Sequence, residues 1–283
     1  MNQKTMLVTG ATSSIGKVTA LELARAGHQV LLTSRDPAKG QRVLEEIRSA
    51  TGNQTLELYV GDFSSMTDVR RVALEVRAKH PKLDVLLNNA GGVFIDRKIT
   101  VDGFEQTFAV NHLAPFLLTN LLLEPLKAGA ARIVNVASNV NNVGRIRWND
   151  LHFKTGYMGF LVYAQSKLMN IVFSNELAKR LHGTGVTSNA LHPGVVRTNF
   201  WDTDNIMMRV IFGVIQRLRA ITPEEASKTT LFLATSSSVE GMTGKYFVAN
   251  QEHKSNPIAD DQSAQKRLWE VSEGLLSKWL EVS

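Results

Sequence analysis

Four polar side chains have the types and spacing that suit proton transfer to and from a substrate oxygen. Tyr163 and Lys167 are four residues apart, a spacing that places two side chains on one face of a helix. A free phenol has a pKa of about 10, so acid–base work near neutral pH needs a lower value, and a neighbouring ammonium group lowers it. Ser138 ends an apolar run upstream, and Asn111 precedes it. These four residues are the candidate catalytic set.

The tyrosine–lysine pair is weak evidence by itself. Such a pair arises by accident in roughly one chain in five of this composition, and it also fits the solvated side of an amphipathic helix. Ser138 could simply end a strand, and Asn111 could cap or kink a helix. The elements around these residues must therefore decide whether they act together.

Apolar runs of strand length alternate with helical stretches along the chain. The expected strands are 6–9, 29–33, 56–60, 84–87, 132–136, 187–191 and 245–248, and the expected helices are 16–26, 37–50, 66–79, 103–127, 158–182, 223–234 and 263–280. This alternation predicts βαβ units, and the apolar strands indicate that helices cover both faces. We expect an α/β fold: a doubly wound parallel sheet of Rossmann type with about seven strands, formed by residues 1–283 as a single domain.

Composition argues against several classes of function. The chain has 283 residues, 43% of them hydrophobic, and no cysteine, which removes disulfides, thiolate nucleophiles and thiolate metal ligands. The net charge of +6 comes from basic residues scattered among acids, which argues against a nucleic-acid partner and suits an anionic cofactor. The N-terminus runs directly into a strand without the pattern of a signal peptide. We expect a cytoplasmic protein without a metal site.

The segment between the first expected strand and helix has the pattern of a phosphate-binding loop, Thr9-Gly10-Ala11-Thr12-Ser13-Ser14-Ile15-Gly16. Gly10 permits a tight turn, Gly16 permits close helix packing, and the helix N-terminus offers N–H groups to a pyrophosphate. The middle position of such loops is normally glycine, whereas here it is Ser14, whose small hydroxyl could bond a phosphate. The alternative is a turn that binds no ligand.

The end of the second expected strand indicates which dinucleotide binds. An acid there accepts hydrogen bonds from the adenosine ribose, whereas a nearby arginine accommodates a 2′-phosphate. Ser34 leaves the acidic position empty and Arg35 follows it, and a guanidinium matches phosphate geometry. Asp36 precedes Pro37 and is expected to cap the next helix. The sequence favours NADP over NAD.

With these motifs in place, the chain resembles a short-chain dehydrogenase/reductase over essentially its whole length. The matching features occur in the family's order: Thr9-Gly10…Ile15-Gly16, Gly61-Asp62-Phe63, Asn88-Asn89-Ala90-Gly91, Asn111, Ser138, Tyr163 with Lys167, and His192-Pro193-Gly194 with Thr198. Within the family it resembles the retinol-dehydrogenase-like branch, through the insert at 141–162, the apolar stretch that begins at 110–113, and the C-terminal segments 244–247 and 267–270. Membrane-bound members carry an N-terminal anchor, which is not expected here.

The resemblance implies a role for each matching position. Tyr163 would be the general acid in reduction and the base in oxidation, while Lys167 would lower its pKa and hold the nicotinamide ribose. Ser138 would stabilise charge on the substrate oxygen, and Asn111 would hold a water that relays protons beyond Lys167. The implied cofactor contacts are Gly10, Thr12, Ser13, Ser14, Ile15, Gly16, Arg35, Asp62, Phe63, Asn89, Ala90, Gly91, Tyr163, Lys167, Pro193, Gly194, Val196 and Thr198.

The segment at about 199–221 is expected to cover the substrate. From Trp201 to Ile221 it is rich in large apolar groups, interrupted by Arg209, Arg217 and Arg219. It fits a lid over a hydrophobic pocket, a helix packed on the core, or a basic amphipathic helix at 201–221 that rests on a membrane surface.

Taken together, these features favour an NADP-dependent oxidoreductase for a small hydrophobic aldehyde, ketone or alcohol. One alternative is reduction of a carbon–carbon double bond, as in protochlorophyllide reductases, against which the absence of cysteine counts. A regulator that senses NADP without catalysis and a membrane-associated scaffold are two others. Pairing of two copies of the chain, through the helices of Asn111 and Tyr163, is also left open.

Overall fold

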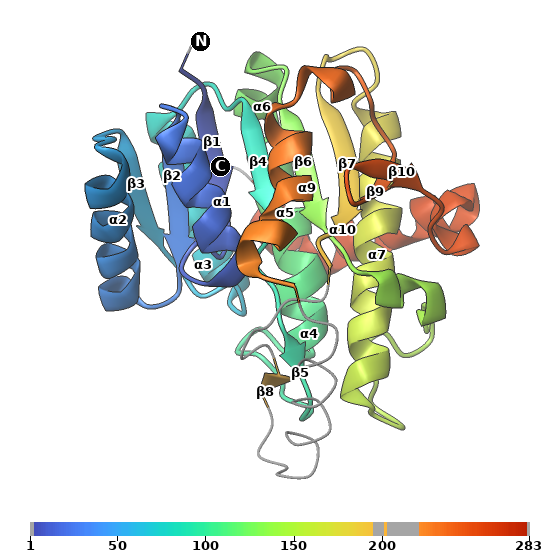
Figure 1. Ribbon diagram of the computed structural model, residues 1–283. Helices are drawn as coiled ribbons and strands as arrows, with labels where there is room; N and C mark the ends of the chain where they lie inside the picture. The colour runs from blue at the N-terminus through green and yellow to red at the C-terminus, as the bar shows by residue number, and fades with distance from the viewer. Residues whose placement is uncertain (1–2, 195–200, 203–220, 282–283) are drawn as a thin grey trace.

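A mostly parallel eight-stranded sheet with helices on both faces forms the centre of the protein (Figure 1). The structure is a computed structural model, and it describes residues 3–194, 201–202 and 221–281. The strand order is β10-β9-β7-β6-β4-β1-β2-β3, and only the β9–β10 pair is antiparallel among the strands of this sheet in the described part of the chain. The strands are β1 (Thr5–Val8), β2 (Gln29–Ser34), β3 (Leu56–Val60), β4 (Val85–Asn88), β6 (Arg132–Val136), β7 (Thr187–His192), β9 (Tyr246–Val248) and β10 (Gln251–His253). The expected fold class is confirmed.

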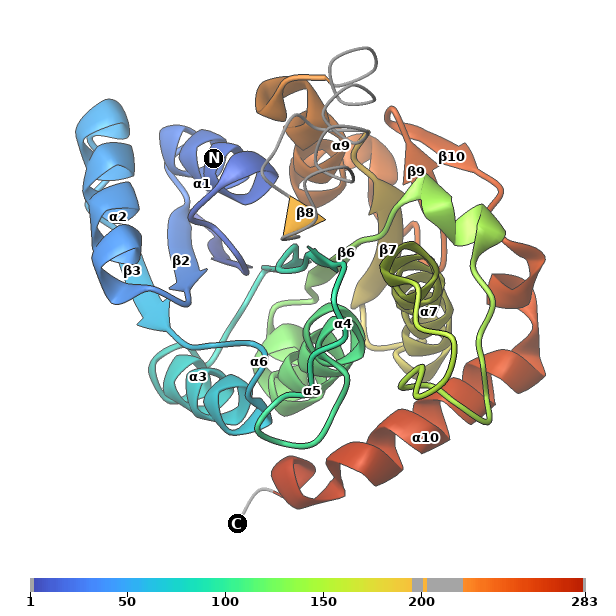
Figure 2. The ribbon, with the colours of Figure 1, turned by 90° about the horizontal axis from the view of Figure 1, so that it is seen from below.

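Two layers of helices cover the sheet, one on each face (Figure 2). One layer contains α1 (Ser14–Arg25), α2 (Pro37–Thr51) and α9 (Pro223–Thr235). The other contains α3 (Met66–Lys79), α5 (Ala114–Leu121), α6 (Leu123–Ala128), α7 (Gly159–Arg180) and α10 (Gln262–Leu280). Strand side chains alternate between the two cores: Leu7 and Leu31 enter the α5–α7 side, whereas Val8 and Leu32 enter the α1–α9 side. The central strands are largely apolar because helices cover both faces of the sheet.

The order of the strands creates the crevice in which ligands of such folds bind. From β1 the chain moves outward through β2 and β3, and it then returns to place β4 on the opposite side of β1. The loops after β1 and β4 therefore diverge at the carboxyl edge of the sheet, and this divergence leaves an opening between them. The two segments at this opening are the phosphate-loop sequence and residues 89–92.

The expected continuous helix at 103–127 is wrong, because the chain forms several shorter pieces there. They are α4 (Gln106–Phe108), a π-helical turn (Ala109–Leu113), α5 and α6. In the π-helical turn the Ala114 N–H donates to the Ala109 carbonyl, five residues back. Pro115 has no N–H to donate to the Asn111 carbonyl four residues before it, so the regular α-helical ladder is interrupted there. The other expected elements lie within two residues of those observed.

Three short strands were not predicted from the sequence. β10 is polar and exposed, and it pairs with β9 through a tight turn in which Ala249 and Asn250 have φ angles of 49° and 65°. β5 (Val93–Phe94) pairs with β8 (Trp201–Asp202) in a separate two-stranded sheet. The main sheet therefore has eight strands rather than about seven.

α10 lies across the outer face of α5 and α7 (Figure 2). Its buried Trp269 packs edge-on against Phe116 of α5 at 4.8 Å and beside Phe173 of α7 at 6.0 Å, measured between ring centroids. The chain's own C-terminal helix thus packs on α5 and α7. None of the helices in the described ranges has both the length and the apolar character that crossing a bilayer requires.

Candidate active site

The loop after β1 is clamped between the neighbouring strands β2 and β4. The Thr9 hydroxyl donates to the Leu87 carbonyl at 3.0 Å and accepts the backbone N–H groups of Asn89 and Ala90, each at 2.9 Å. Gly10 has a φ of 65°, and a Cβ on Gly16 would lie 2.3 Å from the Gly10 carbonyl oxygen. Glycine is therefore required at both positions, at Gly10 for the turn and at Gly16 for close packing.

The N-terminus of α1 is open to an anion. Ser13 is the N-cap residue, but its side chain forms no capping hydrogen bond, and the first turn contains no acidic residue. Ser14 has a φ of 48°, a left-handed conformation that is strained for serine. Its Oγ is buried and has no hydrogen-bond partner among the described residues. Unpaired N–H groups, a helix dipole and a serine hydroxyl at one place suit a phosphate group.

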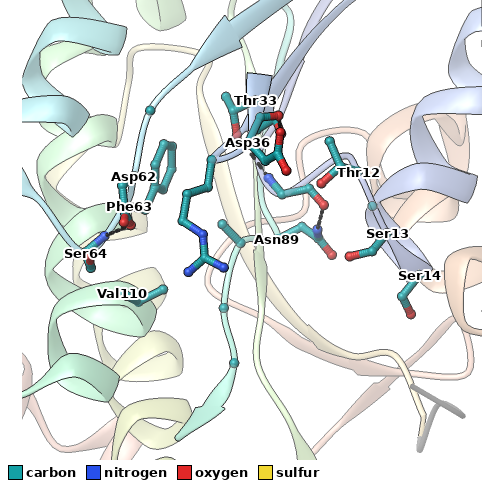
Figure 3. A pocket seen from close by; sticks show the side chains of 18 of the residues that line it. Thr12, Ser13, Ser14, Thr33, Asp36, Asp62, Phe63, Ser64, Asn89 and Val110 are labelled. Carbon is teal, nitrogen blue, oxygen red and sulfur yellow. Dashed lines mark hydrogen bonds between the residues drawn. The ribbon is translucent and has the colours of Figure 1, made fainter. Parts of the chain in front are cut away.

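A groove of about 690 Å³ runs from this loop along the carboxyl edge of the sheet (Figure 3). Ser13 and Ser14 lie on one side of it, Asp62, Phe63 and Val110 lie on the other, and Asn89 lies between them (Figure 3). Twelve of the predicted cofactor residues line this groove: Gly10, Thr12, Ser13, Ser14, Ile15, Gly16, Arg35, Asp62, Phe63, Asn89, Ala90 and Gly91. The structure therefore brings together residues that are up to 81 positions apart in the chain, between Gly10 and Gly91.

The predicted cofactor contacts make up half of the residues that line the groove. The additional lining residues are Thr33, Ser34, Asp36, Lys39, Gly61, Ser64, Gly92, Val93, Phe94, Gln106, Val110 and Pro223. Most of them directly flank the predicted motifs at the ends of β2, β3 and β4, so strand ends were the available signal. Gln106, Val110 and Pro223 reach the groove only through the packing of their elements, which no local pattern indicates.

The far end of the groove carries the residues expected to select the dinucleotide. The Asp36 carboxylate accepts the Lys39 backbone N–H at 3.0 Å and caps α2, as predicted, and this hydrogen bond lowers the pKa of Asp36. The Ser34 hydroxyl donates to the Asp36 carbonyl at 2.7 Å. The cationic residues Arg35 and Lys39 line the groove at this end.

Three of the four candidate catalytic residues meet around α7. Tyr163 is buried and hydrogen-bonded to Ser138, which lies just beyond the end of β6. Lys167 is 3% exposed, and its Nζ donates to the Val136 carbonyl at 2.9 Å and lies 5.6 Å from the centroid of the Tyr163 ring. The four-residue spacing on α7 thus places the ammonium group and the phenol side by side.

Asn111 connects this cluster to the groove. Its Nδ2 donates to Ser166 Oγ on α7 at 3.0 Å and to the Gly92 carbonyl at 2.9 Å, and its Oδ1 accepts the Gly92 N–H at 2.9 Å. A Cβ on Gly91 would lie 2.9 Å from Asn111 Oδ1 and 3.5 Å from Lys167 Nζ. The inner end of the groove, at Gly91 and Gly92, therefore abuts both catalytic candidates, and any side chain on Gly91 would crowd them.

Burial dominates the electrostatics of the cluster. It raises the pKa of the Tyr163 phenol, while the hydrogen bond with Ser138 acts in the lowering direction. Burial also lowers the pKa of Lys167 to about 8. Both shifts have the same cause, because a low-dielectric surrounding disfavours the charged form of either group. The Ser138 hydroxyl therefore favours the ionised form of Tyr163 against the effect of burial.

The residues expected beside the nicotinamide are only partly described. Pro193 and Gly194 line a second cavity of about 260 Å³, together with Asn139 and His192. They do not belong to the set that lines the main groove in the described structure. Val196 and Thr198 lie outside the described residues, as does the expected covering segment at 199–221 except for 201–202 and Ile221.

Sequence comparison relates the chain to known dehydrogenases. The family model for short chain dehydrogenases matches residues 4–209. Mouse retinol dehydrogenase 14 is 41% identical, over 96% of this chain and 86% of its own length, and human retinol dehydrogenase 13 is 40% identical, over 96% and 84%.

Two solved structures have a similar fold. A Mycobacterium paratuberculosis protein superimposes with a TM-score of 0.78 and 31% identity, over 97% of this chain and 94% of its own. The Pseudomonas aeruginosa RhlG/NADP active-site complex superimposes with a TM-score of 0.67 and 26% identity, over 86% and 93%. This chain resembles retinol dehydrogenases in sequence, and it belongs to the short-chain dehydrogenase family.

Proposed function

We propose that this protein is an NADP-dependent oxidoreductase that transfers a hydride between nicotinamide and a hydrophobic carbonyl or alcohol. The observation that carries the proposal is the cluster at the inner end of the groove. A buried phenol is hydrogen-bonded to a serine and lies beside a buried lysine, and the ammonium group of that lysine lies next to Gly91. This arrangement can deliver a proton to a substrate oxygen, or remove one, in a site shielded from water.

The residues that line the groove fit a dinucleotide. The open N-terminus of α1, with Ser13 and Ser14, would hold the pyrophosphate, and Gly10 and Gly16 leave room for it. When bound, the nicotinamide supplies or accepts the hydride, and the protein supplies position and electrostatics. Asp62 and Phe63 would lie against the adenine, and residues 89–91 would lie along the middle of the cofactor.

The preference for NADP follows from the charge at the far end of the groove. Ser34 offers no carboxylate to a ribose, and the Asp36 carboxylate is engaged by the backbone of α2. Arg35 and Lys39 supply positive charge, and a guanidinium pairs well with a phosphate. The structural relative solved with NADP supports this assignment.

Tyr163 is the proposed proton donor in reduction and the acceptor in oxidation. Because burial raises its pKa, the phenol is protonated near neutral pH, which is the form that reduction requires. The Ser138 hydroxyl would stabilise the phenolate that remains, and the direction of its effect on the pKa supports this role. Lys167, with a pKa of about 8, is largely charged at neutral pH and adds to that stabilisation.

Asn111 has a proposed role in the path of the proton. Its side chain is committed to Gly92 and Ser166, whereas its carbonyl lies in the π-helical turn, where Pro115 cannot donate to it. A carbonyl in that position suits a water molecule that passes protons onward from Lys167. The π-helical turn thus gives a structural reason for a functional role at Asn111.

An apolar substrate is supported by the rim of the groove. Met158 and Phe160, at the start of α7, are 59% and 39% exposed, although both are large and apolar. Gly159 between them lies against the backbone of Phe94 and Ile95, and Phe94 lines the groove. The relatives named retinol dehydrogenase point to the same substrate class, a lipophilic alcohol or aldehyde.

The proposal is tested by following NADPH absorbance with a panel of substrates. The panel contains retinal, long-chain aldehydes, apolar ketones, sugars and hydroxy acids, each with NADPH and with NADH. We expect turnover of the apolar carbonyls with NADPH, and a loss of about 10²–10⁴-fold in Tyr163→Phe with unchanged NADPH affinity. Tyr59→Phe is the matched control, because its hydroxyl contacts Glu57 and His80, away from the groove.

A different result would contradict each part of the proposal. Turnover of sugars or hydroxy acids alone would exclude the apolar substrate class. Full activity in Tyr163→Phe would exclude the proposed proton donor. Tight NADPH binding without turnover of any substrate by the wild type would indicate a cofactor-sensing protein instead.

A further inference from the structure

The turn that follows Ser138 is held by its own buried Asn141 and by two buried polar side chains that lie 105 and 115 positions later in the chain. Asn141 is fully buried in the 3₁₀ turn Asn139–Val143, Tyr246 begins β9, and Asn256 precedes the 3₁₀ turn Pro257–Asp260. We call Asn139, Asn141, Tyr246 and Asn256 the amide cluster. None of these residues belongs to the candidate catalytic set.

Asn141 is the centre of the amide cluster. Its Nδ2 donates to the carbonyl oxygen of Ser138 at 2.8 Å and to the Tyr246 hydroxyl at 3.3 Å. Its Oδ1 accepts the Asn256 backbone N–H at 2.9 Å, and its own carbonyl accepts Asn256 Nδ2 at 3.0 Å. Asn141 and Asn256, 115 positions apart, are therefore joined by two hydrogen bonds, and Asn141 is bonded to the Ser138 carbonyl.

Tyr246 and Asn256 hold the turn at further points. The Tyr246 hydroxyl donates to Asn139 Oδ1 at 2.8 Å, so the residue after Ser138 is fixed as well. Asn256 Nδ2 also donates to the Gly144 carbonyl at 3.1 Å. A Cβ on Gly144 would lie 2.6 Å from the Ala164 carbonyl, so the end of the turn packs directly on α7 beside Tyr163. The turn is thus fixed at the end near Ser138 and at the end against α7.

The hydrogen bonds of this turn restrict a group that contacts a candidate catalytic residue. A network with its bonds made in a low-dielectric interior restricts the groups that it joins. Here the joined group is the backbone of Ser138, whose hydroxyl is hydrogen-bonded to Tyr163. Burial raises the pKa of the Tyr246 phenol, and Tyr163 raises it further.

We propose that Asn141, Tyr246 and Asn256 are positioning residues that hold Ser138 in its hydrogen bond with Tyr163, so that residues 246–256 form part of the active site. The catalytic consequence rests on the proposed function. The structural consequence does not, because the Ser138–Tyr163 hydrogen bond can be observed without turnover.

The test uses Tyr246→Phe, which removes a single hydroxyl, alone and combined with Ser138→Ala. Tyrosine labelled with ¹³C at Cζ reports the environment of the Tyr163 phenol by NMR, and Ser138→Ala defines the signal of the broken hydrogen bond. We expect the Tyr163 signal of Tyr246→Phe to move toward that of Ser138→Ala. We also expect kcat to fall about tenfold with unchanged NADPH affinity, and no further fall when Ser138→Ala is already present.

Two results would overturn the proposal: an unmoved Tyr163 signal in Tyr246→Phe, or an equal fall in kcat with and without the Ser138 hydroxyl. If the wild type turns over no substrate, the proposed function fails while the NMR measurement still decides the positioning role. Should Tyr246→Phe not fold, Asn139→Ala takes its place, since Asn139 is exposed and its Oδ1 is the acceptor of the Tyr246 hydroxyl. Tyr59→Phe is the control in every measurement.

Discussion

Replacing Ser14 by glycine separates the backbone strain at this residue from the proposed hydrogen bond of its hydroxyl to a phosphate. Ser14 is strained by its φ of 48°, and its buried hydroxyl has no hydrogen-bond partner among the described residues. A left-handed conformation costs a residue with a side chain about 1–2 kcal/mol. Glycine removes that strain but adds about 0.4–1 kcal/mol of backbone freedom to the unfolded chain. The difference predicts that Ser14→Gly unfolds at the same or a higher denaturant concentration, with a gain in the free energy of unfolding of about 0–1.6 kcal/mol.

The affinity for NADPH should fall in the same variant. A hydrogen bond from a hydroxyl to a charged phosphate contributes about 1.5–3 kcal/mol, and a difference of about 1.4 kcal/mol corresponds to a tenfold change in Kd. We therefore expect Ser14→Gly to bind NADPH about tenfold or more weakly, although its loop then carries glycine at the usual position of such loops. The proposed phosphate contact is thus measured without any substrate.

The assay combines NADPH fluorescence titration with urea unfolding of the free protein. Ala130→Gly is the matched control, because Ala130 has a φ of 44°, is exposed, and lies between α6 and β6, away from the groove. It should gain similar stability with an unchanged Kd. If Ser14→Gly bound NADPH as tightly as the wild type or more tightly, the Ser14 hydroxyl would not be a phosphate ligand and its side chain would only obstruct the loop.

Three further predictions concern stability. Burial lowers the pKa of Lys167 from 10.5 to about 8, so between these pH values the unfolded chain binds a proton that the folded chain does not, and stability must rise with pH. Relative to Lys167→Met, the free energy of unfolding should rise by about 3 kcal/mol from pH 8 to 10.5, and a flat difference in urea unfolding would contradict the shift. Trp269→Ala should lose about 3–5 kcal/mol by removing the ring that packs on Phe116 and Phe173, and a loss below about 1 kcal/mol in urea unfolding would mean that α10 is not firmly packed. Gly274→Ala should gain about 1 kcal/mol, because Gly274 is an exposed position of α10 where a Cβ meets no other atom, and a destabilised variant in thermal unfolding would refute that reasoning.

Local sequence patterns were sufficient for most of the fold and for part of the site. The β1 loop could be recognised because Gly10, Gly16 and the adjoining strand and helix are neighbours in the chain. Tyr163 and Lys167 could be placed on one face because helical spacing depends only on position. The cap formed by Asp36 followed from the proline after it. Each of these predictions rests on residues that are close in sequence.

The errors arose where distant contacts override local preference. The apolar segment 103–127 has helical periodicity, yet Pro115 and the packing of Asn111 on Gly92 and α7 divide it. β10 has no apolar pattern, because it is an exposed edge strand held by its turn and by β9. Asn141 and Asn256 carry no signal in sequence, because their significance lies in contacts across 115 positions.

The amino-acid sequence by itself determined the alternation of strands and helices, the phosphate-loop pattern, the tyrosine–lysine spacing and the family, because periodicity and motif order are properties of the chain alone. Only the tertiary structure decided that burial raises the pKa of Tyr163 against the effect of the Ser138 hydroxyl, that α10 covers α5 and α7, and that Tyr246 and Asn256 contact the turn after Ser138. The physical reason is that desolvation and hydrogen bonding depend on which groups share a small volume. That proximity is established only when segments far apart in the chain pack together.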